Sequence, residues 1–229
     1  WIKSDVVNLP TLCKGLAKLV VVDIALNRDQ DNPQLIFESM NSTGKELSQA
    51  DSIRNFILMG LEPALQTRLY EQFWRPIEMD FGQEAYGTHF DGFMRHYLTV
   101  MSGEMPNTNA VYEAFKTHAR ETRAGAVSDD SHVEMLVSTI RDYSRYFCAM
   151  ALGKEIDHEL NRAFHDLREL KVDVAYPFLL ELYRDYATQY LSKSDFVSAV
   201  RWVEAYVFRR AVCAIPTNSM NKTFATFSK

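Results

Sequence analysis

The sequence predicts a mainly α protein, an irregular multi-helix bundle with at most one or two short strands near the N-terminus. From residue 57 onward, apolar residues recur every three or four positions, the spacing that places them on one face of a helix. The 229 residues include only 9 Gly and 7 Pro, which is few for the many turns of an all-β fold. No repeat of fixed period occurs, so an irregular bundle is favoured over a solenoid.

The composition limits the classes of protein to which the chain can belong. A net charge of -5 argues against a protein that coats nucleic acid through bulk charge, although a local basic groove stays compatible with it. The three cysteines are far apart and form no C-x-x-C pair, so we expect neither a disulfide framework nor a zinc site. The longest apolar run, 16–26, contains Lys18 and Asp23 and is too short to span a membrane.

The first sixty residues contain predicted helices and one predicted strand. Residues 9–18 should form a short helix, and the branched residues of 19–26 are the one strand candidate. A further helix ends at the polar turn 41–44. Ser48 should cap the helix that follows, with Asp51 as the acidic half of a capping pair.

The remaining helices are predicted from their apolar stripes and from residues that favour helix ends. Pro76 should bend or end the first of them, because proline lacks the backbone N–H that a helix interior needs. Ser131 and Ser194 are the predicted caps of two long helices. Trp74 and Trp202 are predicted core residues. The predicted helical ranges are 62–79, 88–101, 108–123, 131–151, 157–170, 175–191 and 194–215, with an interior loop at 123–130.

One stretch, residues 36–57, carries a dense motif. Its pattern F-E-x-x-N-x-x-G-x-x-L-x-x-x-D-x-I-R-N resembles a motif in the N-terminal half of GmrSD-type restriction enzymes, the type IV enzymes that act on modified DNA. The last part of the chain, R-R-x-x-C-x-x-P-T-N-x-x-N-K, is similar to the segment ahead of the nuclease in that family. The residues of the first pattern are Phe37, Glu38, Asn41, Gly44, Leu47, Asp51, Ile53, Arg54 and Asn55.

The resemblance implies a parent protein with a ParB-like nucleotide-binding domain, a helical region and an HNH nuclease domain. Two further motifs of that nucleotide-binding domain, Gln-Arg and Asp-Gly-Gln-Gln-Arg, do not occur here. We therefore expect a fragment: 1–60 as the end of the nucleotide-binding domain, 61–215 as a helical bundle domain and 216–229 as a linker toward the nuclease. For the parent, the resemblance implies a nucleoside triphosphate, a divalent metal and DNA, including modified DNA, as ligands.

In function, the resemblance implies a bacterial, cytoplasmic phage-defence protein, and a homo-oligomer is compatible with it. This chain would couple nucleotide-dependent sensing of modified DNA to the HNH nuclease without being catalytic itself. A second interpretation is a helical protein-interaction scaffold without a nucleic-acid role, with which the acidic composition and aromatic-rich helices agree. A third is an enzyme whose site is assembled from scattered helices.

The resemblance implies that Phe37, Asn41, Gly44 and Asp51 line the nucleotide pocket. From the residues alone, a glycine turn followed by a capped helix explains the same pattern without a ligand. Arg54 and Asn55 are further pocket candidates. Arg54 is equally suited to a surface ion pair with a neighbouring carboxylate, Asp51 or Glu38.

Basic and amide residues near the C-terminus are the candidates for DNA contact, because arginines and small amides suit phosphate groups. The alternative is a structural C-terminal helix followed by a polar cap and linker. The candidates are Arg201, Arg209, Arg210, Asn218, Asn221 and Lys222.

Two groups of histidines invite a metal-site interpretation, and their spacing argues against both. His158, Asn161 and His165 lie within one predicted amphipathic helix, whereas an HNH nuclease spreads its ligands over a ββα scaffold. His89 and His96 share one helix face without an evident third ligand, so we expect a solvated face there. We assign neither a metal ligand nor a catalytic residue.

Overall fold

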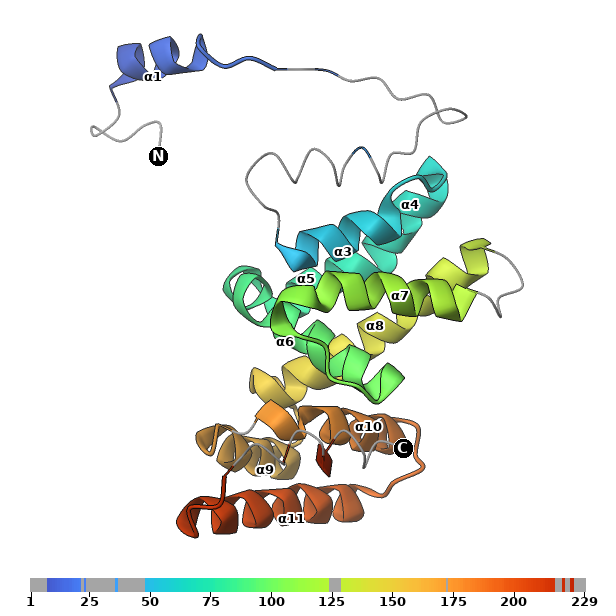
Figure 1. Ribbon diagram of the computed structural model, residues 1–229, viewed down its shortest axis with the longest axis vertical. Helices are drawn as coiled ribbons and strands as arrows, with labels where there is room; N and C mark the ends of the chain where they lie inside the picture. Colours follow the sequence, from blue (N-terminus) through green and yellow to red (C-terminus); the bar gives the residue numbers. More distant parts are fainter. Residues whose placement is uncertain are drawn as a thin grey trace.

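A computed structural model of the chain describes residues 8–21, 23, 36, 48–123, 129–171, 173–216, 220, 223 and 224. Within these residues every regular element is helical, which confirms the predicted mainly α, multi-helix bundle (Figure 1). The elements are α1 (Leu9–Leu16), α3 (Gln49–Leu58), α4 (Pro63–Leu69), η1 (Tyr70–Trp74), α5 (Arg75–Phe81), α6 (Gln83–Ser102), η2 (Thr108–Ala110), α7 (Val111–Arg123), α8 (Asp129–Ala151), α9 (His158–Glu169), η3 (Asp173–Ala175), α10 (Tyr176–Ala187) and α11 (Lys193–Val212).

The N-terminal helix α1 differs from the others because it buries no residue. It lies apart from the bundle in Figure 1. The strand predicted for 19–26 is wrong at its described positions, where Leu19, Val20 and Val21 have no strand conformation and are exposed. A strand needs a partner to pair its backbone groups, and the described part of the chain contains none.

The long helix α8 connects the two halves of the bundle. On one side it packs against α5, α6 and α7, and on the other against α9 and α10. Helix α3 joins the first half through α6 and α7, whereas α11 closes the second half by packing on α9 and α10 (Figure 1). One continuous core therefore runs from Ala50 to Phe224, and α3 is part of it. The domain boundary at residue 60 stays a prediction.

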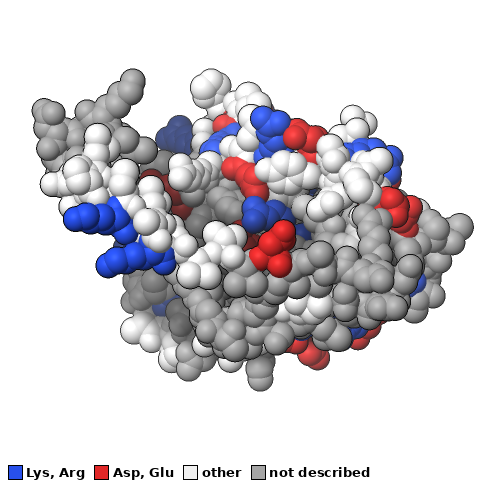
Figure 2. All heavy atoms as spheres, turned by 90° about the horizontal axis from the view of Figure 1, so that it is seen from above, with Lys and Arg blue, Asp and Glu red and all other residues white. Residues whose placement is uncertain are grey.

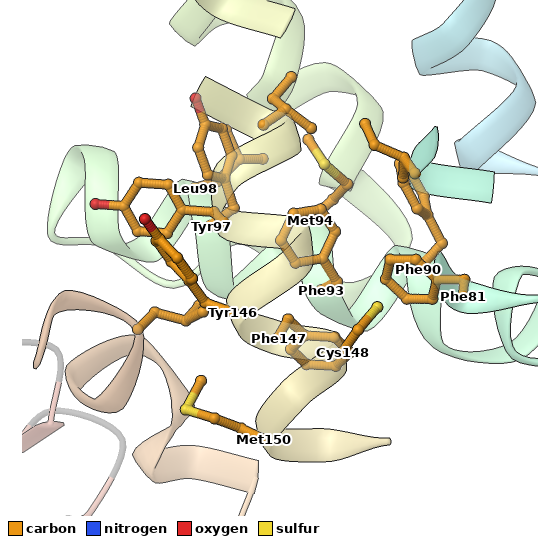
Figure 3. Packing of buried hydrophobic residues seen from close by; sticks show 14 of the residues in the cluster. Phe81, Phe90, Phe93, Met94, Tyr97, Leu98, Tyr146, Phe147, Cys148 and Met150 are labelled. Atoms are coloured by element: carbon orange, nitrogen blue, oxygen red, sulfur yellow. The ribbon is translucent and has the colours of Figure 1, made fainter. Parts of the chain in front are cut away.

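Aromatic rings from α5, α6 and α8 fill the centre of this core (Figure 3). Phe93 is fully buried, and its ring centroid lies 5.8 Å from that of Phe81 and 5.5 Å from that of Phe147. Phe81 also stacks on Phe147 with the centroids 5.9 Å apart. Tilted and edge contacts at such separations are favourable for aromatic pairs beyond the area that they bury. The predicted apolar stripe of 88–101 is thus a core stripe.

Pro76 does not end the helical path, which continues to Phe81, and a bend at this residue stays a prediction. The turn before it, Tyr70–Trp74, is a π-helix, and the N–H of Arg75 bonds to the carbonyl of Tyr70, five residues earlier. Pro76 lies directly after this wider turn, in the first turn of α5, the part of a helix that tolerates proline best. The helical path ends at Gly82, which has a φ of 75° that favours glycine.

Several predicted helix starts are also wrong by a few residues. α6 begins at Gln83 rather than 88, and α8 begins at Asp129, so Ser131 is inside its first turn. The cap of α11 is Ser192 rather than Ser194, since the Ser192 side chain accepts from the N–H of Asp195. Both serines in this stretch have the chemistry of a cap, and sequence alone does not distinguish them.

Candidate functional sites at α3 and α11

Two side chains accept hydrogen bonds from backbone N–H groups at the start of α3. The hydroxyl of Ser48 accepts from the backbone N–H of Asp51 at 3.1 Å, which confirms the predicted cap. The carboxylate of Asp51 accepts from that hydroxyl at 2.8 Å. Asp91 of α6 accepts from the backbone N–H of Ala50 at 3.1 Å, so a second carboxylate satisfies the positive end of the helix.

Gln49 joins α3 to the start of α7. Its side-chain amide donates to the carbonyl of Thr108 at 2.8 Å and accepts from the N–H of Tyr112 at 3.0 Å. The Tyr112 N–H belongs to the first turn of α7, where backbone donors lack partners within the helix. One side chain therefore fixes the position of α3 relative to α7.

Arg54 lies between two carboxylates. Its guanidinium is 3.1 Å from Asp51 of the same helix and 3.1 Å from Glu78 of α5. Glu78 also accepts from the hydroxyl of Tyr70 at 3.2 Å, and its negative charge raises the pKa of that phenol. About a third of each ion-paired side chain on α3 is exposed, 31% for Arg54 and 33% for Asp51, so these pairs contribute modestly to stability.

Half of the predicted pocket residues lie on described parts of the chain. The ion pairs of Arg54 agree with its interpretation as a surface ion-pair partner rather than a pocket residue. Asp51 takes part in capping α3. Asn55 is partly buried on the same helix. The predicted pocket residues Phe37, Asn41 and Gly44 lie outside the described residues.

Two of the three candidate arginines on α11 are engaged within the protein. Arg201 donates to Asp166 of α9 and to Glu204 of α11, both at 2.6 Å, so its charge is balanced. The pKa of Asp166 is lowered by this hydrogen bond. Arg210 donates to the Tyr206 hydroxyl at 3.1 Å and lies over the Tyr206 ring. Arg201 therefore joins α11 to α9, whereas the contact of Arg210 with Tyr206 lies within α11 itself.

Arg209 differs because it is exposed and has no ion pair with a described residue. It lies two helical turns after Trp202 and therefore on the same side of α11. Trp202 was predicted to be a core residue, and this is wrong: 74% of it is exposed. Phe208 and Val212 are exposed on the same helix. The other DNA-contact candidates, Asn218, Asn221 and Lys222, lie outside the described residues.

The histidines give no metal site in the described part of the chain, where no three His, Cys, Asp or Glu side chains are grouped to hold an ion. Asn161 donates to the carbonyl of Glu155 at 3.1 Å, and His165 lies beside Asp166 on the surface. The solvated face predicted for His89 and His96 is correct for His89 and wrong for His96, of which 6% is exposed.

Buried titratable groups in the core stay uncharged at neutral pH. Burial raises the pKa of the Cys148 thiol to about 12, and it raises the pKa of Tyr97 further. Burial lowers the pKa of His96 to about 3, so its imidazole is neutral. These groups are suited to packing rather than to proton transfer.

The surface at the α3 and α4 end has charges of both signs. Lys and Arg side chains are interspersed with Asp and Glu among the described residues of the bundle there (Figure 2). The described residues of this face therefore form no extended basic patch. Among the described residues, no helix combines the length and the apolar character that crossing a membrane requires.

The polar contacts of α3 were missed by sequence reasoning. Gln49, Glu78 and Asp91 contact residues 24 to 63 positions away in the chain, and the local sequence contains no signal for such contacts.

Comparison of the chain with known protein families, with characterised proteins and with solved structures finds no match.

Proposed function

We propose that this chain is the helical coupling region of a GmrSD-like, modification-dependent restriction protein. In this proposal the parent is a bacterial, cytoplasmic phage-defence enzyme that uses a nucleoside triphosphate and a divalent metal. The chain transmits the state of the nucleotide-binding domain to the HNH nuclease domain and contacts DNA. It performs neither hydrolysis nor cutting itself.

The observation that carries the proposal is the attachment of α3 to the bundle. α3 contains the second half of the family-like motif, from Asp51 to Asn55. Its first turn is bonded to α6 through Asp91 and to α7 through Gln49, and Arg54 pairs with α5. A displacement of the motif would therefore move three helices of the bundle together, because packed helices shift as rigid elements.

The DNA contact is assigned to the outward face of α11. Arg201 pairs with carboxylates and Arg210 donates to the Tyr206 hydroxyl, whereas Arg209 is exposed without an ion pair to a described residue, which leaves its charge available for a phosphate. Trp202 on the same face offers an aromatic surface, a common companion of cations in nucleic-acid sites. The net charge of -5 means that binding must come from such a local site.

The test is the binding of a fluorescent DNA duplex to the 229-residue chain, measured by anisotropy from low to physiological salt. Replacing Arg209 by Ala should weaken binding and lower the slope of log affinity against log salt by about 1, as expected for one lost phosphate contact. Arg120→Ala is the matched control. It removes one exposed charge from α7, at the far side of the bundle core from α11, so its effect on affinity should be small.

Equal losses in the two variants would reflect net charge alone and would contradict a DNA site on α11. An absence of binding at low salt would also contradict it. That second outcome would favour a helical protein-interaction scaffold without a nucleic-acid role. The exposed Trp202, Phe208 and Val212 support this alternative, since apolar side chains grouped on a surface are typical of protein contacts.

A further inference from the structure

A cavity opens where α6, the end of α8, the end of α9 and the start of α10 meet. Its volume is about 420 Å³, within the range of small-molecule sites. Phe147 and Ala151 of α8 and Tyr176 of α10 form its apolar wall. The rings of Phe147 and Tyr176 meet edge to face with their centroids 5.6 Å apart, so this wall is rigid.

Gly92 of α6 keeps the cavity open. It lines the cavity, and a Cβ atom placed on it would meet no atom within 4 Å. Glycine in the interior of a helix costs about 1 kcal/mol relative to alanine, and the backbone of Gly92 does not require glycine. A larger side chain there would fill the space that a ligand needs.

His96, one helical turn after Gly92, also lines the cavity. Only 6% of it is exposed, and its Nδ1 atom is buried without a hydrogen-bond partner in the described part of the chain. An unmet lone pair is less costly than an unmet N–H, so the neutral ring carries its proton on Nε2. The Nε2–H group is then the donor that the ring has for a cavity ligand.

The rim of the cavity carries one more positive than negative charge. Arg168 and Lys171, at the end of α9, face it together with the carboxylate of Asp173. Arg168 is held in place because its guanidinium also donates to the carbonyl of Met150 at 2.6 Å. A fixed guanidinium and a nearby ammonium group suit a carboxylate ligand.

We propose that this cavity is a binding site for a small aromatic carboxylate. The flat ring of the ligand packs on Phe147 and Tyr176, and its carboxylate accepts hydrogen bonds from Arg168, Lys171 and His96. The charge balance of the rim fits a monoanion better than a phosphate ester with two charges, because Asp173 repels the second charge. This site is separate from the DNA contact proposed on α11 and does not depend on it.

The test uses benzoate as the probe and follows the ring signals of His96 by NMR during a titration of the whole chain. Benzoate at millimolar concentration should shift these signals to saturation. Benzamide, which has the same shape without the charge, should bind about tenfold more weakly, the effect of losing charged hydrogen bonds. Lys171→Gln should likewise weaken the binding of benzoate.

Gly92→Leu is the variant that closes the cavity, and Gly87→Leu is its matched control. Both glycines lie on α6, and an added Cβ meets nothing within 4 Å at either position, so both variants should fold. Gly87 does not line the cavity. We expect the response of His96 to benzoate to be lost in Gly92→Leu and kept in Gly87→Leu.

Three outcomes would overturn the proposal. The first is no shift of the His96 signals with benzoate, and the second is an unchanged response in Gly92→Leu. The third is a stronger response to inorganic phosphate than to benzoate, which would assign the cavity to phosphate instead.

Discussion

The helices α6 and α11 have the same length, 20 residues, and very different surroundings. α6 is packed by α5, α7, α8 and α10 and buries four consecutive residues, from His96 to Thr99. Among the described helices, α11 packs closely against two, α9 and α10. It buries one stripe, Phe196, Val200, Val203 and Val207. The number of neighbouring helices therefore decides how much of a helix becomes core.

Two tryptophans illustrate the consequence. Trp74 is completely buried in the π-helical turn, and its indole N–H donates to the hydroxyl of Tyr86 at 3.2 Å. Trp202 is mostly exposed on α11. The same residue type is thus a core element in one region and a surface element in the other, so substitution should cost much more stability at Trp74 than at Trp202.

The largest expected effect is that of Trp74→Ala. The variant loses a fully buried side chain and leaves the Tyr86 hydroxyl without its donor, so the free energy of unfolding should fall by about 3–5 kcal/mol. Urea denaturation measures this difference, and Trp74→Phe should lose less because the ring contact with Phe90 is kept. A loss below about 1 kcal/mol would remove the distinction between the two regions.

An intermediate effect is expected from two aspartates whose pKa values move in opposite directions. Asp157 caps α9 and pairs with Lys193 of α11 at 2.7 Å, and the hydrogen bond from Lys193 lowers its pKa. Burial raises the pKa of Asp91, which caps α3. Asp157 therefore contributes stability at pH values above its pKa in the unfolded chain. This contribution is lost as the pH falls through its lower pKa in the folded protein. For Asp91, stability falls as the pH rises from the unfolded to the folded pKa.

The free energy of unfolding, measured from about pH 3 to pH 6, tests these signs. In Asp157→Asn the rise of stability with pH should be shallower than in the wild type. In Asp91→Asn it should be steeper, because a contribution of opposite sign is removed. Slopes that change in the same direction in both variants would show that the two helix starts do not differ in this way.

The smallest expected effect is that of Trp202→Ala. Because its side chain is exposed, the free energy of unfolding should change by no more than about 0.5 kcal/mol, despite the size of the indole. The measurement is the same urea denaturation as for Trp74→Ala. A loss of several kcal/mol would mean that α11 is covered in the folded protein, and the contrast with α6 would disappear.

The sequence predicts local features of the fold well and long-range ones poorly. Helical periodicity identifies the core stripe of α6, and the spacing from Ser48 to Asp51 identifies the start of α3, because both depend on neighbouring residues. The burial of His96 and the exposure of Trp202 depend on which helices pack nearby, and local sequence does not contain that information. In the candidate site at α3, the ion pair between Arg54 and Asp51 was one of the predicted alternatives. The partners Glu78 and Asp91 come from other helices and were not predicted.

The π-helical turn at Tyr70–Trp74 also affects which insertions and deletions the chain can accept. A π turn holds about one residue more than an α turn, so deleting one residue there would restore an ordinary helix without breaking the chain path. A π turn and an α turn each complete about one full rotation, so the deletion would leave α5 facing the same way. Ile77 and Phe81 would then stay in the core, and Glu78 would stay beside Arg54. Homologues that lack a residue in this turn should therefore need no compensating changes along the buried face of α5.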